Sequence, residues 1–148
     1  MSIYIATINI EAPLEDVFKT ISKAKEFSNA IPHILEIEFL SEIHEGIGTK
    51  FRETRLMNKR KSITTLEVTE FVRNESTRII SIAGGTTWDS LFSVKQEENH
   101  VKLTLEMEAK AHHIFAKIMN HFIKSMLQKA LNDDLNSVRE YCENNKVN

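Results

Sequence analysis

The sequence of 148 residues has a single cysteine, Cys142, which excludes an internal disulfide. A lone thiol is typical of proteins that fold in a reducing compartment. No stretch approaches about 18 uncharged apolar residues, the length a membrane-spanning helix needs. The N-terminal stretch MSIYIATINIEAP lacks the basic segment and the cleavage site of a secretory signal. We therefore expect a cytoplasmic protein without integral membrane association.

The sequence also has almost no excess of one sign of charge over the other. The 19 Lys and Arg residues nearly balance the 21 Asp and Glu residues, which leaves a formal net charge of −2. The only local basic run is NKRK at residues 58–61, where a hairpin turn is expected. Neither a nucleic-acid partner nor an anionic membrane is indicated by this balance. The length predicts one domain over residues 1–148, able to bury about two thirds of its unfolded surface.

Only four glycines and two prolines interrupt the chain. The β-branched stretch 3–10 predicts a strand, which ends before Pro13, a residue typical of the first turn of a helix. A first short helix is expected up to residue 22. A second one over residues 23–31 should end at Pro32, because proline disfavours helical geometry in the residue before it.

After Pro32 the pattern becomes that of strands joined by short turns, which predicts antiparallel pairing. The clearest strand covers residues 101–109, where apolar residues alternate with Lys, Thr and Glu. This alternation gives the sheet one apolar and one polar face. Six strands are expected after Pro32, at 33–43, 50–57, 62–72, 77–83, 86–94 and 101–109.

From His112 to Tyr141 the apolar period becomes that of one long helix. We expect this helix to cover the apolar face of the sheet, because no other element is large enough. The predicted fold class is α+β: a seven-stranded curved antiparallel sheet wrapped around a long C-terminal helix, with two short helices between the first two strands. If the sheet curls around this helix, a cavity is left between them. Its roof is expected to consist of Phe115, Ile118, Met119, Phe122 and Met126.

This order of elements resembles the helix-grip fold of the START-like, or SRPBCC, superfamily, in particular its polyketide cyclase/dehydrase-like and coenzyme-Q-binding-like branch. The segments INIEAPLEDVFKTISKAKEFSNAIPHI, EGIGTKFRETR, LEVTEFVRNESTRIISIAGG and WDSLFSVKQEENHVKLTLEME carry the resemblance, which covers essentially the whole chain. Two stretches depart from the family pattern: SKAKEF is basic where an acidic residue is usual, and EENH replaces a Gly-rich turn. The resemblance implies the fold but does not select among the carriers, cyclases and chaperone-activating modules of the superfamily.

The strand KFRETRLM places Phe51, Glu53, Arg55 and Met57 on one face. The apolar members should face the helix, so the two charges point into the cavity as well, or toward its mouth. Buried charges are tolerated only when they are paired or hydrated. They are therefore predicted to form a polar hook that orients a ligand. The alternative is a β-bulge that shifts the register and turns both charges to solvent.

Further candidates for the cavity wall are Trp88, Leu105 and Met107, with Trp88 near the rim because it follows the Gly84–Gly85 turn. Phe115, Met119, Phe122 and Met126 complete the predicted ligand-binding set. Methionine fills adaptable space in binding sites, although core packing is the commoner role of such a stripe.

No metal site or cofactor is predicted, because the histidines have no His-x3-His spacing. His112 at the edge of the helix stripe and His33 after Pro32 are candidate pocket donors, with a solvated or capping role as the alternative. Cys142 is interpreted as a packing residue, and no nucleophile motif occurs. Catalytic residues are thus not assigned.

The function predicted is the binding of a small hydrophobic or amphipathic molecule between sheet and helix. The resemblance implies a lipid, a quinone or a polyketide-like compound as the ligand. We expect the protein to be a monomer or a homodimer. One alternative is an enzyme of the cyclase or dehydratase type, with Glu53 or His112 as general acid or base. Another is a protein-interaction module like the chaperone-activating members.

Overall fold

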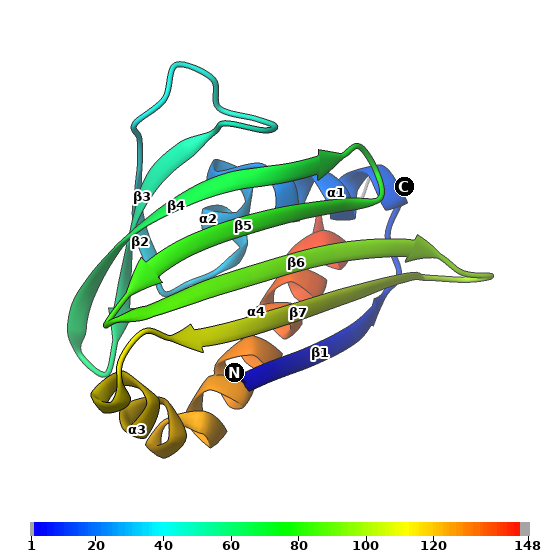
Figure 1. Cartoon of the computed structure of the whole chain (residues 1–148). Coiled ribbons are helices and arrows are strands. Elements are labelled where there is room, and N and C mark those ends of the chain that lie inside the picture. Colours follow the sequence, from blue (N-terminus) through cyan, green and yellow to red (C-terminus); the bar gives the residue numbers. More distant parts are fainter. Residues whose placement is uncertain (1, 146–148) are drawn as a thin grey trace.

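A computed structural model describes residues 2–145 and shows a seven-stranded antiparallel sheet that curls around the helices (Figure 1). The strands lie in the order β1-β7-β6-β5-β4-β3-β2. The predicted helix-grip α+β fold class is confirmed. The elements are β1 (Ser2–Ile10), α1 (Leu14–Ser22), α2 (Ala24–Ala30), β2 (Ile34–Phe39), β3 (Lys50–Met57), β4 (Arg60–Val72), β5 (Ser76–Ala83), β6 (Thr86–Gln96), β7 (Val101–Ala111), α3 (Ile114–Phe122) and α4 (Lys124–Asn144).

The alternation in β7 shows why the sheet has one buried face. Its apolar residues from Val101 to Ala109 are all buried, while the intervening polar residues are exposed or half-buried. The helices α1, α2 and α4 lie on this side of the sheet (Figure 1). Within residues 2–145 no helix is long and apolar enough to cross a lipid bilayer.

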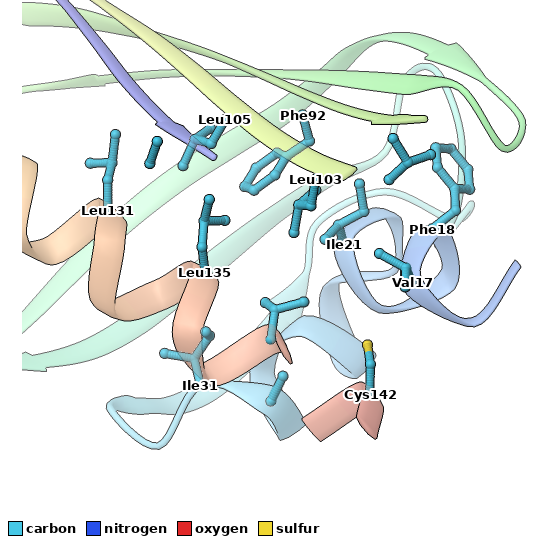
Figure 2. Close-up of a cluster of buried hydrophobic side chains, with 14 of the residues drawn as sticks. Val17, Phe18, Ile21, Ile31, Phe92, Leu103, Leu105, Leu131, Leu135 and Cys142 are labelled. Atoms are coloured by element: carbon cyan, nitrogen blue, oxygen red, sulfur yellow. The ribbon is translucent and has the colours of Figure 1, made fainter. Parts of the chain in front are cut away.

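A hydrophobic core fastens α1 and the C-terminal part of α4 to the sheet (Figure 2). Val17 and Ile21 of α1, Leu135 of α4 and Leu103 of β7 are members of this core. Cys142 lies in the core as well, where its thiol donates to Thr20 Oγ1 over 3.4 Å. Burial raises the pKa of the Cys142 thiol, so the residue packs rather than reacts.

The helix expected over residues 112–141 is divided in two, which corrects the prediction of one continuous helix. The break falls at Ile123, whose φ of −97° and ψ of 6° end α3 and precede α4. Hydrogen bonds continue across it, from Ile123 N to Met119 O (3.2 Å) and from Leu127 N to Ile123 O (2.9 Å). The junction contains neither proline nor glycine, so its sequence carries none of the usual signals of a break.

Candidate functional site

A cavity of about 370 Å³ lies between the concave face of the sheet and the helices α1, α2 and α4. The wall is mainly apolar, with hydroxyl groups from β4, β5 and β6 among its side chains. The apolar members include Phe27, Ile37, Phe51, Leu66, Ile79 and Phe92.

The strand β3 supplies one side of this wall. Phe51, Glu53, Arg55 and Met57 all line the cavity. Pairing between β3 and β4 is regular from one end of β3 to the other. The irregularity lies in β2 instead, between Ile34 and Glu36. Glu53 and Arg55 therefore point into the cavity. Of the two alternatives from the sequence, the structure has the inward orientation and not the β-bulge in β3.

Arg55 forms the centre of a charged cluster in the wall. Its Nε donates to Glu53 Oε1 over 2.9 Å, and its Nη1 donates to Asp134 Oδ2 of α4 over 3.0 Å. The three side chains are only 14–21% exposed. Because two carboxylates surround one guanidinium, the cluster is negative when all three groups are ionised, and β3 is tied to α4 across the cavity.

Burial has opposite effects on the two partners of this bridge. It lowers the pKa of Arg55, but the carboxylates of Asp134 and Glu53 more than compensate, so the guanidinium stays charged. Burial raises the pKa of the Asp134 carboxyl, and the attraction of Arg55 offsets this only in part. Asp134 is thus a carboxyl in a cavity whose proton is held more tightly than in water.

Asp134 was not among the sequence candidates, although its position carries a signal. It follows Leu127 by seven residues and Leu131 by three, so all three share one helix face. An acid inside an apolar stripe is a candidate for a buried partner. In the structure all three line the cavity, together with Ala130 and Ile123.

A second polar point lies in the wall away from the charged cluster. Ser22 at the end of α1 and Thr49 just before β3 both line the cavity. Their hydroxyl oxygens are buried and have no hydrogen-bond partner among the described residues. Buried polar groups are usually satisfied, so two unsatisfied hydroxyls in a cavity wall are available to a ligand or to water.

The remaining predicted wall residues come from β6 and β7. Trp88, Leu105 and Met107 all line the cavity. The Trp88 indole donates to the Ala83 carbonyl over 3.2 Å, so its one donor is already used within the protein. Trp88 therefore presents an aromatic surface rather than a hydrogen bond to the cavity.

The four remaining candidates lie outside the cavity, which corrects the predicted roof. Phe115, Met119, Phe122 and Met126 are 66%, 45%, 75% and 43% exposed. The break at Ile123 separates α3 from α4, so the stripe on α3 does not continue over the sheet. Leu127, Ala130 and Leu131 of α4 form the roof in its place.

Solved structures share this architecture over almost the whole chain. The protein TTHA0849 from Thermus thermophilus aligns with a TM-score of 0.77 and 17% identity, covering 95% of this chain and 97% of its own. Ara h 8.0201 aligns with a TM-score of 0.76 and 13% identity, covering 97% and 99%. The di-domain ARO/CYC StfQ from the steffimycin biosynthetic pathway aligns with a TM-score of 0.79 and 8% identity, covering 96% of this chain and 51% of StfQ.

The chain has the START-like helix-grip fold. The sequence identities to these structures are low, so the similarity shows a shared fold alone. No protein-family model matches the sequence, and no curated protein matches it significantly either.

The histidines of this helix-grip chain lie outside the cavity, which removes His112 from the candidate acid–base groups. The exposed His112 ring has Nε2 2.6 Å from Thr87 Oγ1. His33 is exposed and contributes its carbonyl to Leu56 N over 2.8 Å. The His113 ring caps α3 by accepting from Ala116 N over 3.1 Å. Across residues 2–145, no group of three His, Cys, Asp or Glu side chains is placed to hold a metal ion.

Proposed function

We propose that this protein binds a small hydrophobic or amphipathic molecule in the cavity, with a neutral polar group of the ligand against Arg55, Glu53 and Asp134. The observation that carries the proposal is an apolar cavity of about 370 Å³ with one charged cluster in its wall. Ligand pockets commonly measure about 300–1,000 Å³ and combine an apolar wall with a few polar groups. The ARO/CYC proteins of the same fold support a polyketide-like compound, beside a lipid or a quinone.

The charges of the cluster limit which polar group the ligand can place against it. Two carboxylates already occupy the guanidinium of Arg55, so a third carboxylate from a ligand would be repelled. A hydroxyl or phenol can instead donate to Glu53 or Asp134 at no electrostatic cost. The proposed ligand therefore carries a hydroxyl or phenol group rather than an acid.

The unsatisfied hydroxyls of Ser22 and Thr49 supply a second contact for the same ligand. Along the inward face of β3, Glu53 and Arg55 follow Thr49 by four and six residues. This separates the two polar points by about 13–20 Å of extended chain. A ligand with a second oxygen beyond an apolar segment would pair with these hydroxyls, which have no partner among the described residues.

A pair of substitutions on β6 tests the cavity itself. Ser90 lines the cavity, whereas Ser93 is an odd number of residues away and faces the other side of the sheet. Ser90→Phe should obstruct the cavity, and Ser93→Phe adds the same side chain outside it. We expect 2-naphthol to bind the wild type and Ser93→Phe alike, and to bind Ser90→Phe at least about tenfold more weakly, by calorimetry and by quenching of Trp88.

Comparison of 2-naphthol with 2-naphthoate tests the polar group on an identical ring system. The neutral phenol should bind the wild type at least about tenfold more tightly, because the carboxylate meets Glu53 and Asp134. Tighter binding of 2-naphthoate, or equal loss of 2-naphthol binding in Ser90→Phe and Ser93→Phe, would contradict the proposal.

A cyclase or dehydratase activity on such a ligand is the second candidate, and Asp134 is the observation that favours it. A carboxyl with a raised pKa in a cavity is suited to act as a general acid. Glu53, predicted from the sequence for this role, lies on the same guanidinium. Variants Asp134→Asn and Glu53→Gln that keep ligand binding but lose turnover of a bound polyketide-like substrate would support an enzyme.

A further inference from the structure

The helix α3 turns its apolar side away from the rest of the protein. The side that packs consists of the small Ala116, which is 2% exposed, and of Asn120, whose amide donates to Thr86 Oγ1 over 2.9 Å. In an ordinary surface helix the apolar side faces the core. Here that side is exposed; we call it the α3 face, and it consists of Ile114, Phe115, Ile118, Met119 and Phe122.

The turn between β3 and β4 extends the α3 face. Asn58 Nδ2 of this turn lies 4.0 Å from Met126 Sδ in the first turn of α4. Both α3 and the β3–β4 turn lie at the same end of the molecule (Figure 1). Met57 and Met126 are exposed there too, so apolar side chains continue from α3 toward the turn. A contiguous exposed apolar surface of this kind marks an interaction site.

Unpaired cations border this surface. Lys59, Arg60 and Lys61 are exposed in the turn and at the start of β4, and Lys117 and Lys124 are exposed on α3 and at the start of α4. Within residues 2–145 none of these five forms an ion pair. No Asp or Glu occurs in the sequence from residue 109 to residue 132. The net charge of −2 therefore conceals a locally basic end.

The cavity opens at this same end. Among the lining residues, all of which belong to the described part of the chain, only Met57 is exposed, at 41%. Ile123, the residue that follows α3, also lines the cavity. The α3 face thus lies beside the mouth of the cavity.

We propose that the α3 face and the β3–β4 turn dock on the surface of an anionic lipid bilayer, with the mouth of the cavity toward the lipid. Aromatic and aliphatic side chains on one side of a helix enter the interfacial region, and neighbouring cations bind anionic headgroups. The charge favours lipid over a second copy of this chain, because a symmetric dimer would bring two sets of the same cations together. If the cavity binds a hydrophobic ligand as proposed above, that ligand enters from the bilayer without crossing water.

Vesicle flotation tests the docking. The wild type should float with vesicles of phosphatidylcholine and phosphatidylglycerol and not with phosphatidylcholine alone. Lys59→Glu/Lys61→Glu should weaken flotation by more than about tenfold, since each cation near an anionic surface contributes roughly a fivefold factor. Its matched control is Lys95→Glu/Lys102→Glu, which makes the same change in net charge on exposed residues of β6 and β7, away from α3. This control should float more strongly than the turn variant.

The apolar part has its own variant and control. Phe115→Ser/Phe122→Ser should abolish flotation, whereas Ile47→Ser, at an equally exposed position in the loop between β2 and β3, should leave it unchanged. Both positions of the double variant are exposed, so the variant should fold normally, which circular dichroism checks. Equal flotation with both vesicle types would overturn the proposal. So would a wild-type dimer that is lost in the double variant and never floats.

Ser90→Phe separates this proposal from the proposed function. It should bind 2-naphthol at least about tenfold more weakly and still float, because a substitution inside the cavity leaves the α3 face intact. If the wild type floats but binds no 2-naphthol, ligand binding fails and docking stands. If it binds 2-naphthol but does not float, docking alone is overturned.

Discussion

At the scale of single residues, Arg55 explains how a hydrophobic chamber contains charges. A guanidinium buried alone would be costly, but two carboxylates satisfy Nε and Nη1 at 2.9 and 3.0 Å. The same arrangement leaves one negative charge in excess. Each carboxylate depends on Arg55, so the cluster is a unit rather than three independent side chains.

Asp134 gives this cluster a predictable pH dependence. Its pKa is raised in the folded protein, mainly by burial, and returns to its ordinary value on unfolding. The folded state therefore holds the proton more tightly. The protonated Asp134 therefore adds to the free energy of unfolding. This contribution is fully present below the pKa that Asp134 has in the unfolded chain, and it is lost as the pH rises through the pKa that Asp134 has in the folded protein.

Urea unfolding of the wild type and Asp134→Asn at a series of acidic pH values measures this effect. The free energy of unfolding of the wild type, relative to the variant, should fall as the pH rises through that window. A relative stability that rises with pH would show that the attraction of Arg55 outweighs burial, and would contradict the raised pKa.

At the scale of secondary-structure elements, the position of α3 depends on Gly85 in the β5–β6 turn. Gly85 has φ of +73°, and a Cβ there would collide with the His113 ring that caps α3. The Gly85 carbonyl also accepts from His112 N over 2.8 Å. These contacts, with Ala116 and Asn120, hold α3 against the end of the sheet.

Gly85→Ala should therefore loosen α3 while the sheet stays folded. We expect faster amide hydrogen exchange in residues 114–122 and a loss of about 1 kcal/mol or more of stability. Gly84→Ala is the matched control, since Gly84 also has a positive φ of 60° but nothing within 4 Å of an added Cβ. Equal exchange of α3 in both variants would show that the contact with His113 is not what seats the helix.

The sequence predicted the strands and the two short helices better than the C-terminal helix, because alternation and proline positions are local signals. The expected strand at 50–57 coincides with β3. The sequence left open whether Glu53 and Arg55 point inward or to solvent, and in the structure both line the cavity. The stripe on α3 was recognised, but periodicity does not show which side faces the protein. The break at Ile123 could not be predicted, because neither Gly nor Pro lies near this residue in the sequence. Asp134 was missed because its partner Arg55 lies 79 residues away.

At the scale of the whole molecule, the space between the sheet and α4 is a packed core in one part and a cavity in another. The core around Leu103 and Leu135 is filled and anchors α4 (Figure 2). Toward α3 the same sheet and helix enclose a cavity instead. A filled core supplies stability, whereas an apolar cavity loses packing contacts that a ligand can restore. The fold thus has a packed core around Leu103 and Leu135 and a cavity toward α3.

Native mass spectrometry of gently purified protein, followed by denaturation and identification of what is released, tests ligand binding most directly. We expect a bound apolar molecule with a hydroxyl or phenol group on the wild type and on Ser93→Phe, and none on Ser90→Phe. A released molecule retained equally by Ser90→Phe, or a wild type that is free of ligand after expression in several hosts and also fails to bind 2-naphthol, would contradict it.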